Sequence, residues 1–350
     1  MLVNLISGDT PRSAVLTVLL LIVLVCLAGA PFLFPGVRSL ETAATICIFI
    51  LLVASYDLLL GYTGIVSFAH TMFFGLGAYG VALASIHIGR GWGALIVGSL
   101  SGAVAAAALA LIIGLFSLRV RAIFFAMITL AVASAVAVLV SQLFNITGGE
   151  DGLTYLIPRE LTPAFRMGEL FGVRVNGRVL NYYLIFVACL ALFLLLLRIV
   201  NSPFGRVLQA IRENDFRAEA IGYRVVWYRT AATCLSAAIA ALAGALYAIW
   251  LRYVGPDTTL SFEIMLDILL MVVIGGMGTM YGAVLGAVIF VLAQNYLQNL
   301  MGVAAEATEA LPILPLFLDP NRWLLWLGLL FILSVYFFPT GIVGRLRSGR

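Results

Sequence analysis

The sequence contains no lysine, and arginine supplies all 20 of its basic residues. A Walker A loop requires a lysine that reaches the nucleotide phosphates. The sequence therefore excludes an ATPase site of this kind. We expect the chain not to be an enzyme and to hold no cofactor of its own, so that any ATP hydrolysis is carried out by another polypeptide.

Charged residues are also scarce. They make up 10% of the chain, and the net charge is only +4. The arginines lie mainly between apolar runs, which favours the positive-inside topology of a membrane protein over a nucleic-acid-binding surface. Cysteine is equally sparse, and the four cysteines all fall inside apolar runs. We therefore expect small buried side chains there, without a disulfide framework or a metal site.

Apolar residues dominate what is present. They form 63% of the chain, and the mean hydropathy is +1.13. Repeated apolar runs of about 20 residues match the thickness of a bilayer. We therefore predict an all-α membrane protein with one transmembrane domain over residues 1–350 and about ten transmembrane helices, some short or broken by glycine. The predicted spans cover residues 14–34, 40–60, 61–86, 93–118, 123–143, 182–197, 230–250, 262–274, 281–300 and 323–338.

The first apolar run has two interpretations. Arg12 precedes it, and Ala28-Gly29-Ala30 resembles the cleavage site of a signal peptide. An uncleaved first span is the favoured alternative, since many further spans follow. Ten crossings then place both termini on one side, together with 12 of the 20 arginines. We expect that side to be cytoplasmic and the polar loop 145–181 to form a structured external cap.

The most polar stretch between two spans covers residues 202–229, named here the coupling segment. Ser202 and Pro203 suit a helix start. Apolar residues then recur at helical spacing, and Gly222 is placed to end the helix. We expect one amphipathic helix that docks in a groove of a partner. The alternative is an interfacial helix that touches only lipid headgroups, but three acidic residues among the arginines disfavour it.

Four stretches carry a resemblance to a known family. The coupling segment sequence SPFGRVLQAIRENDFRAEAIGY resembles the cytoplasmic segment of bacterial branched-chain amino acid ABC transporter permeases of the LivM type. Three further motifs resemble the same family in the same order: GYTGIVSFAHTMFFGLGAYG, TGGEDGL, and MVVIGGMGTMYGAVLGA followed by FFPTGIVGR. The resemblance implies a multi-pass permease of the bacterial inner membrane that translocates branched-chain amino acids or related small polar solutes.

The same resemblance implies partners: a second, LivH-type permease, two ABC ATPase subunits and a periplasmic substrate-binding protein. It also implies that residues of the coupling segment contact the ATPases. We assign this coupling role to Gly205, Arg212, Glu213, Asn214, Glu219 and Gly222. Ala69 and Ala283 stand where the family usually has glycine and proline. Because the family also includes permeases for urea, short amides and small carboxylates, the substrate stays open.

Glycine gathers in two membrane stretches. Residues 75–80 match the dinucleotide pattern G-x-G-x-x-G, but no strand precedes them and no acidic residue follows about 20 positions later. Gly278, Gly282 and Gly286 recur every four residues along one helix face. Close helix packing and contact with substrate are the two interpretations of both stretches.

Polar side chains inside spans are costly and usually face a cavity or a partner. Ser67 and His70 are three residues apart, so we expect them on one helix face. Glu263 and Asp267 either meet the ammonium group of a substrate or pair with Arg252. The candidate substrate path comprises Ser67, His70, Phe74, Glu263 and Asp267.

Two other functions remain open at this stage. An ion-coupled secondary transporter of amino acids would use Asp57, Glu263 and Asp267 as coupling groups. An intramembrane hydrolase would use Ser67, His70 and Asp57, although no oxyanion-hole motif is present and neighbours on one helix rarely give attack geometry.

Overall fold

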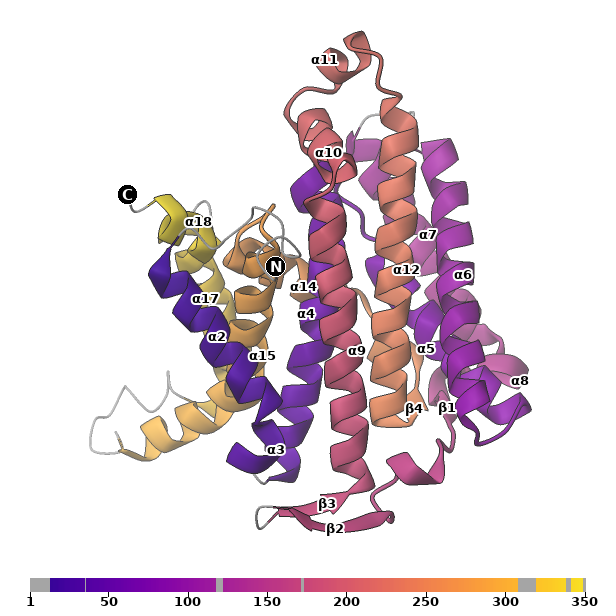
Figure 1. Ribbon diagram of the computed structural model, residues 1–350, viewed down its shortest axis with the longest axis vertical. Coiled ribbons are helices and arrows are strands. Elements are labelled where there is room, and N and C mark those ends of the chain that lie inside the picture. The colour runs from indigo at the N-terminus through magenta and orange to yellow at the C-terminus, as the bar shows by residue number, and fades with distance from the viewer. Residues whose placement is uncertain are drawn as a thin grey trace.

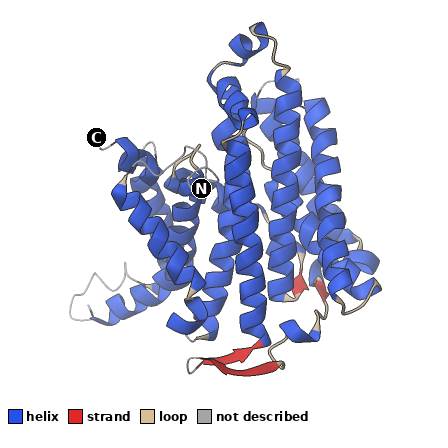
Figure 2. Cartoon of the chain, in the orientation of Figure 1, coloured by secondary structure: helices blue, strands red, loops and turns tan. Residues whose placement is uncertain are grey.

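The computed structural model describes residues 13–34, 36–117, 122–170, 173–307, 319–337 and 341–348. Long helices lie side by side, and two short sheets lie at one end of the molecule (Figures 1 and 2). The longer helices are α2 (Ala14–Ala28), α4 (Val37–Thr63), α5 (His70–His87), α6 (Trp92–Ser117), α7 (Ala122–Gln142), α9 (Gly177–Val200), α12 (Val225–Leu251), α14 (Phe262–Gly275), α15 (Met280–Ala307) and α17 (Trp323–Phe337). The shorter ones are α3 (Ala30–Leu33), α8 (Phe144–Thr147), α10 (Pro203–Glu213), α11 (Asp215–Ala220), α13 (Pro256–Thr259) and α18 (Gly341–Ser348).

The all-helical membrane fold is confirmed. Within the described residues, seven helical segments are long and apolar enough to cross a bilayer. This is fewer than the ten runs in the sequence. The helices α2 and α17 have only 15 residues each, below the roughly 20 that a crossing needs. In the third predicted span, α5 begins only at His70, because residues 64–69 are not helical.

Helix α4 is the centre of the bundle. Nearly every side chain from Leu40 to Thr63 is buried. It packs against α9 and α12 on one side and against α14 and α15 on the other (Figure 1). The helices α5 and α6 pack against α12 and complete the larger half of the molecule. A helix that is apolar on all sides, as α4 is, can be covered by neighbours on every face and so forms the interior of the bundle.

Both glycine-rich stretches bring helices into close contact. A side chain at Gly77 of α5 would collide with the backbone of Ala241 in α12. A side chain at Gly286 of α15 would collide with the backbone of Met271 in α14. Small residues at such crossings let helix backbones approach closely in a membrane. The geometry accords with the packing interpretation of both stretches.

The polar loop that follows α7 is structured. It contains the 3-10 turns η1 (Gly149–Asp151) and η2 (Arg159–Leu161) and the strands β1 (Leu153–Thr154), β2 (Arg166–Leu170) and β3 (Val173–Asn176). Strands β2 and β3 form an antiparallel pair. Strand β1 pairs with β4 (Tyr253–Val254) just after α12, so the loop is tied to the helix bundle. The loop ends at Gly177, where α9 begins five residues before the predicted span.

The coupling segment differs from the single helix that its sequence predicts. It forms two helices, α10 and α11, which project at one end of the molecule (Figure 1). Asn214 separates them with an extended backbone, and its side chain accepts the N–H of Arg217 at 2.8 Å to cap α11. An asparagine cap competes with helix continuation in this way. Gly222 follows α11 with a φ of 99°, so the predicted helix end is confirmed.

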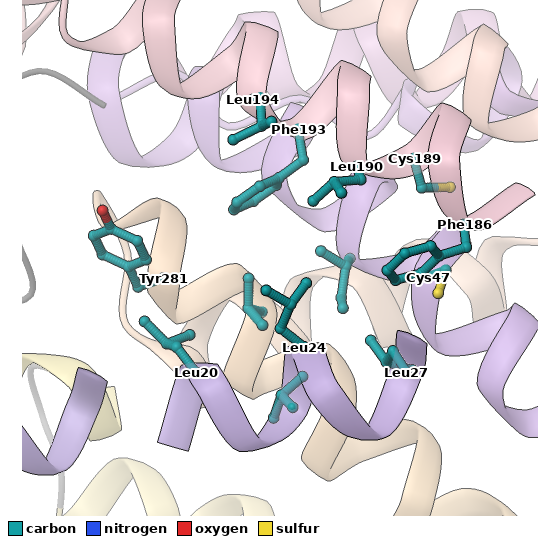
Figure 3. Close-up of a pocket in the computed structure, with 13 residues that line it drawn as sticks. Leu20, Leu24, Leu27, Cys47, Phe186, Cys189, Leu190, Phe193, Leu194 and Tyr281 are labelled. Atoms are coloured by element: carbon teal, nitrogen blue, oxygen red, sulfur yellow. The ribbon is translucent and has the colours of Figure 1, made fainter. Parts of the chain in front are cut away.

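The four cysteines differ in burial. Cys47 and Cys189 are buried as expected, and Cys234 is partly buried. Cys26 is exposed, because the rest of the chain leaves one face of α2 uncovered. The two buried thiols line an apolar cavity of about 190 Å³ between α2, α4, α9 and α15 (Figure 3). The phenol of Tyr281 is the most polar group in its lining. Such a lining offers no partner to a charged solute.

Candidate functional site

The coupling segment is held to the membrane helices by its own apolar face. Gly205 is buried, and a side chain there would collide with the backbone of Val200 at the end of α9. Ile211, Ala218 and Val225 form a small cluster that joins α10, α11 and α12. The structure thus places Gly205 at an internal contact. Helix α10 contacts three long helices, α4, α9 and α12.

The tip of the coupling segment exposes apolar side chains. Phe216 of α11 is 80% exposed and Ile221 is 72% exposed. The predicted coupling residues Glu213 and Glu219 are also exposed beside them. Large apolar side chains surrounded by charges of both signs are typical of a protein-binding surface.

Arg212 points from α10 toward the membrane helices. Its Nη1 atom donates a hydrogen bond to the carbonyl oxygen of Gly61 in the last turn of α4. Its side-chain carbons lie beside Gly64, where a β-carbon would be 3.2 Å from Cγ of Arg212. Of the residues with a predicted coupling role, Arg212 is therefore the one that connects the coupling segment to the centre of the bundle.

Asp57 lies one turn before Gly61 in α4 and is only 1% exposed. Its Oδ1 atom accepts the backbone N–H of Gly278 at 2.8 Å. Gly278 stands between α14 and α15, where the chain reverses with a φ of 80°. The other carboxylate oxygen, Oδ2, is buried and has no hydrogen bond of good geometry among the described residues.

A second buried polar cluster surrounds His70 at the start of α5. Its Nε2 atom lies 2.8 Å from Oγ of Ser55 in α4. The Ser55 hydroxyl donates to the carbonyl of Leu52 at 2.7 Å, so the imidazole donates from Nε2 and leaves Nδ1 as an acceptor, for which the described part of the chain offers no partner. Ser236 of α12 donates to the Ser55 carbonyl at 2.6 Å. The cluster joins three helices.

The expectation that Ser67 and His70 share a helix face is wrong. Ser67 precedes α5 in non-helical backbone, and its Oγ accepts the N–H of Ala69 at 3.3 Å. His70 pairs with Ser55 instead, and Asp57 binds Gly278. The described contacts therefore do not form the hydrolase arrangement. Sequence spacing misplaced Ser67 because the helical period applies only where the backbone is helical.

The remaining candidates for the substrate path lie apart. Phe74 is fully buried between α5 and α12, where its ring centroid is 5.5 Å from that of Tyr247. Glu263 and Asp267 lie in the first half of α14. Among the described side chains, no ion pair joins either carboxylate to Arg252. Arg252 lines another cavity, beside Arg178.

A cavity of about 460 Å³ lies between the start of α5, one face of α7, the turn η1 and the segment α13–α14. Its lining combines carboxylates, hydroxyls and an amide with apolar groups. The polar members are Thr71, Ser134, Ser141, Gln142, Glu150, Asp257 and Ser261. The apolar members include Phe68, Leu260 and Phe262. Small-molecule sites show this mixture of apolar walls with a few polar groups.

Most of the residues that line this cavity were not predicted from the sequence. Ser134 and Ser141 are seven residues apart and so lie on one face of α7, which is a detectable signal in an otherwise apolar span. Glu150 belongs to the TGGEDGL motif, which resembles the LivM-type family, but the resemblance assigns no role to the carboxylate. Asp257 follows a proline after β4, and nothing in the sequence brings it near α7.

Comparison with known proteins identifies relatives over most of the chain. The family described as "branched-chain amino acid transport system / permease component" matches residues 39–320. The high-affinity branched-chain amino acid transport system permease protein LivM of Salmonella typhimurium is 29% identical over 84% of this chain and 71% of its own length. The LivM protein of Escherichia coli is 28% identical over the same shares.

A probable branched-chain amino acid transport permease protein LivM of Methanocaldococcus jannaschii is 30% identical over 61% of this chain and 58% of its own length. No solved structure is significantly similar to the chain. The family match covers well over half of the sequence and includes α4, α5, the coupling segment and α14–α15. The chain belongs to the family of permease components of branched-chain amino acid transport systems.

Proposed function

We propose that the chain is one of two permease subunits of a bacterial ABC importer in the inner membrane. It provides a path for branched-chain amino acids or closely related small solutes. Separate ATPase subunits drive transport along this path, and a periplasmic binding protein delivers the solute. The family match and the LivM relatives support the transport role. The absence of lysine is consistent with this division of labour, because a Walker A loop for ATP needs a lysine.

The observation that carries the ATPase coupling is the exposed tip of α11. Phe216 and Ile221 cannot be covered by any described neighbour within the chain. Acidic and basic side chains surround them, which disfavours insertion into lipid. A groove on an ATPase that receives these two side chains would bury them at the centre of an interface, where a few aromatic and aliphatic anchors supply most of the binding energy. Glu213 and Glu219 would form the polar rim.

The positions of the helix ends support the proposed topology. Leu16 of α2, Leu285 of α15 and Val343 of α18 form one cluster. The start of α15 also adjoins Arg212 through Gly278. The first and last described helices therefore reach the same end of the bundle as the coupling segment. When α2, α17 and α5 with the non-helical residues before it are added to the seven apolar helices, the ten crossings put this arginine-rich end in the cytoplasm.

The cavity beside α7 is the proposed entry to the substrate path. It lies at the end of the molecule that carries β1 and η1, which the ten-crossing topology places outside. Glu150 and Asp257 suit an ammonium group, and the Ser134 hydroxyl can donate to a carboxylate. The Ser141 hydroxyl donates to the Ala137 carbonyl at 3.1 Å and can donate to a solute once it turns from that bond. Phe68 and Phe262, with ring centroids 6.2 Å apart, supply an apolar wall for an aliphatic side chain. We assign the uncovered face of α7 to the second permease subunit.

The proposal is tested by purifying the complex through this chain and reconstituting it in proteoliposomes. We expect ATPase subunits, a second permease and a binding protein to copurify. Uptake of radiolabelled leucine should require ATP and the binding protein. Uptake by this chain alone, driven by an ion gradient, would instead establish the secondary transporter.

A further inference from the structure

Three parts of the chain that are distant in sequence meet at one point near the coupling segment. Gly61 lies in the last turn of α4, Gly278 lies between α14 and α15, and Arg212 lies in the last turn of α10. A β-carbon at Gly61 would collide with the backbone nitrogen of Gly278. A β-carbon at Gly278 would be 2.7 Å from Nη1 of Arg212. The approach is so close that only glycine fits at the two backbone positions.

Not every polar group at this point has its best hydrogen-bond partner among the described residues. Arg212 donates to the neutral carbonyl of Gly61. The Asp57 carboxyl group, one turn away, accepts the N–H of Gly278 through Oδ1 and also interacts with the backbone of Thr279, while its buried Oδ2 has no hydrogen bond of good geometry among the described residues. The positive charge of Arg212 is close enough to act on this carboxyl group electrostatically. A buried carboxylate oxygen without a partner is energetically unfavourable, and a guanidinium is its best available donor.

We infer that Arg212 is a positioning residue that transmits movement of the coupling segment to α4 and to the α14–α15 junction, by exchanging its hydrogen bond between the Gly61 carbonyl and the free oxygen of Asp57. This inference rests on the proposed function as an ATP-driven permease. It assigns Arg212 a role inside the membrane subunit and not at the ATPase surface.

The geometry supports an internal role. Ile211, next to Arg212, is buried in the cluster that fixes α10 to α11 and α12. A displacement of the α11 tip therefore moves α10, and Arg212 moves with it. The guanidinium then either pulls on Gly61 or transfers to Asp57, and both change the contact between α4 and Gly278. Two discrete hydrogen-bonding arrangements are what a switch element requires.

The experiment uses the complete importer, with all partner subunits, in proteoliposomes. For Arg212→Ala, we expect the ATPases to copurify in the normal ratio and ATP hydrolysis to continue. The number of leucine molecules taken up per ATP should fall by about tenfold or more, the size of a typical coupling free energy. Arg212→Lys retains one charged donor and should lie between this variant and the unchanged protein. Arg198→Ala, at the exposed end of α9, is the control for loss of one arginine and should keep full uptake.

Two further variants separate transmission from simple stabilisation. Asp57→Asn keeps the oxygen that accepts the Gly278 N–H but replaces the free acceptor, so uptake per ATP should fall while the complex stays assembled. The double variant Arg212→Ala with Asp57→Asn no longer contains an unpaired buried carboxylate. Its thermal stability should exceed that of Arg212→Ala, whereas its uptake per ATP should not recover.

Three results would overturn the inference: normal uptake per ATP in Arg212→Ala, loss of the ATPases from that variant, or recovery of uptake in the double variant. Loss of the ATPases would identify Arg212 as a docking residue, and recovery would show that its role is only structural. A failure of the proposed function is distinguishable, because the unchanged importer would then show no ATP-dependent uptake.

Discussion

Helices α4 and α7 are nearly equal in hydropathy, at 2.3 and 2.4, yet they occupy opposite environments. Of the 18 most apolar consecutive residues of α4, 78% are buried within the chain, whereas in the corresponding stretch of α7 only 11% are buried. The polar groups differ in the same way. Ser55 and Asp57 of α4 bind other helices, while Ser134 and Ser141 of α7 line a cavity. Equal hydropathy thus places both helices in the membrane but does not reveal which one forms the core.

The sharpest test applies one substitution to both helices. Ser55→Leu in α4 removes a hydrogen bond to His70 and forces a larger side chain into a fully packed site. We expect it to lower the stability of the purified chain by roughly 3 kcal/mol. The matched variant Ser134→Leu in α7 should change stability by only about 0.5 kcal/mol or less. Thermal unfolding in detergent measures both, and equal losses would contradict the comparison.

The same contrast extends to the coupling segment, where Leu208 of α10 is buried and Phe216 of α11 is exposed. Phe216→Asp combined with Ile221→Asp should leave the thermal stability of this chain unchanged. It should weaken ATPase binding by about 30-fold or more, since anchor residues of an interface contribute about 2 kcal/mol or more. Copurification and titration with the isolated ATPase measure this. Unchanged binding would show that the tip is not the docking surface.

The smallest expected effect concerns substrate passage. Combined substitution of Ser134 and Ser141 by alanine removes two hydroxyls from the cavity without altering the packing of α7. Leucine uptake at low concentration should fall by about fivefold for each hydroxyl that bonds the solute, because a hydrogen bond contributes about 1 kcal/mol. The ATPase activity of the importer should not change. Full uptake would place the substrate path away from this face of α7.

The sequence predicted the membrane fold and several local features correctly. Gly276 ends α14 just after the short predicted span, and Gly222 ends α11. These features depend on residues close in sequence, where glycine alone adopts the required backbone freely. The predicted helices were wrong where one or a few residues interrupt a periodic pattern. Asn214 splits the coupling segment, and the non-helical residues before His70 separate Ser67 from it.

The candidate site was less accessible to prediction. Arg212 was singled out from the sequence, but its partners Gly61 and Gly278 are 151 and 66 positions away, and the pattern gave no sign of them. Asp57 was recognised as unusual because a carboxyl group inside a span needs a partner. Which partner it has depends on how α14 and α15 reverse beside α4.

The sequence by itself determined that this protein is a helical bundle in a membrane. Every backbone group in a bilayer must be paired locally, and apolar runs of sufficient length satisfy this as helices wherever they later pack. Only the tertiary structure decided that α4 is central, that α7 borders a cavity, and that Arg212 reaches the α14–α15 junction. Contacts between distant segments depend on the shapes of whole helix faces, which no local pattern encodes.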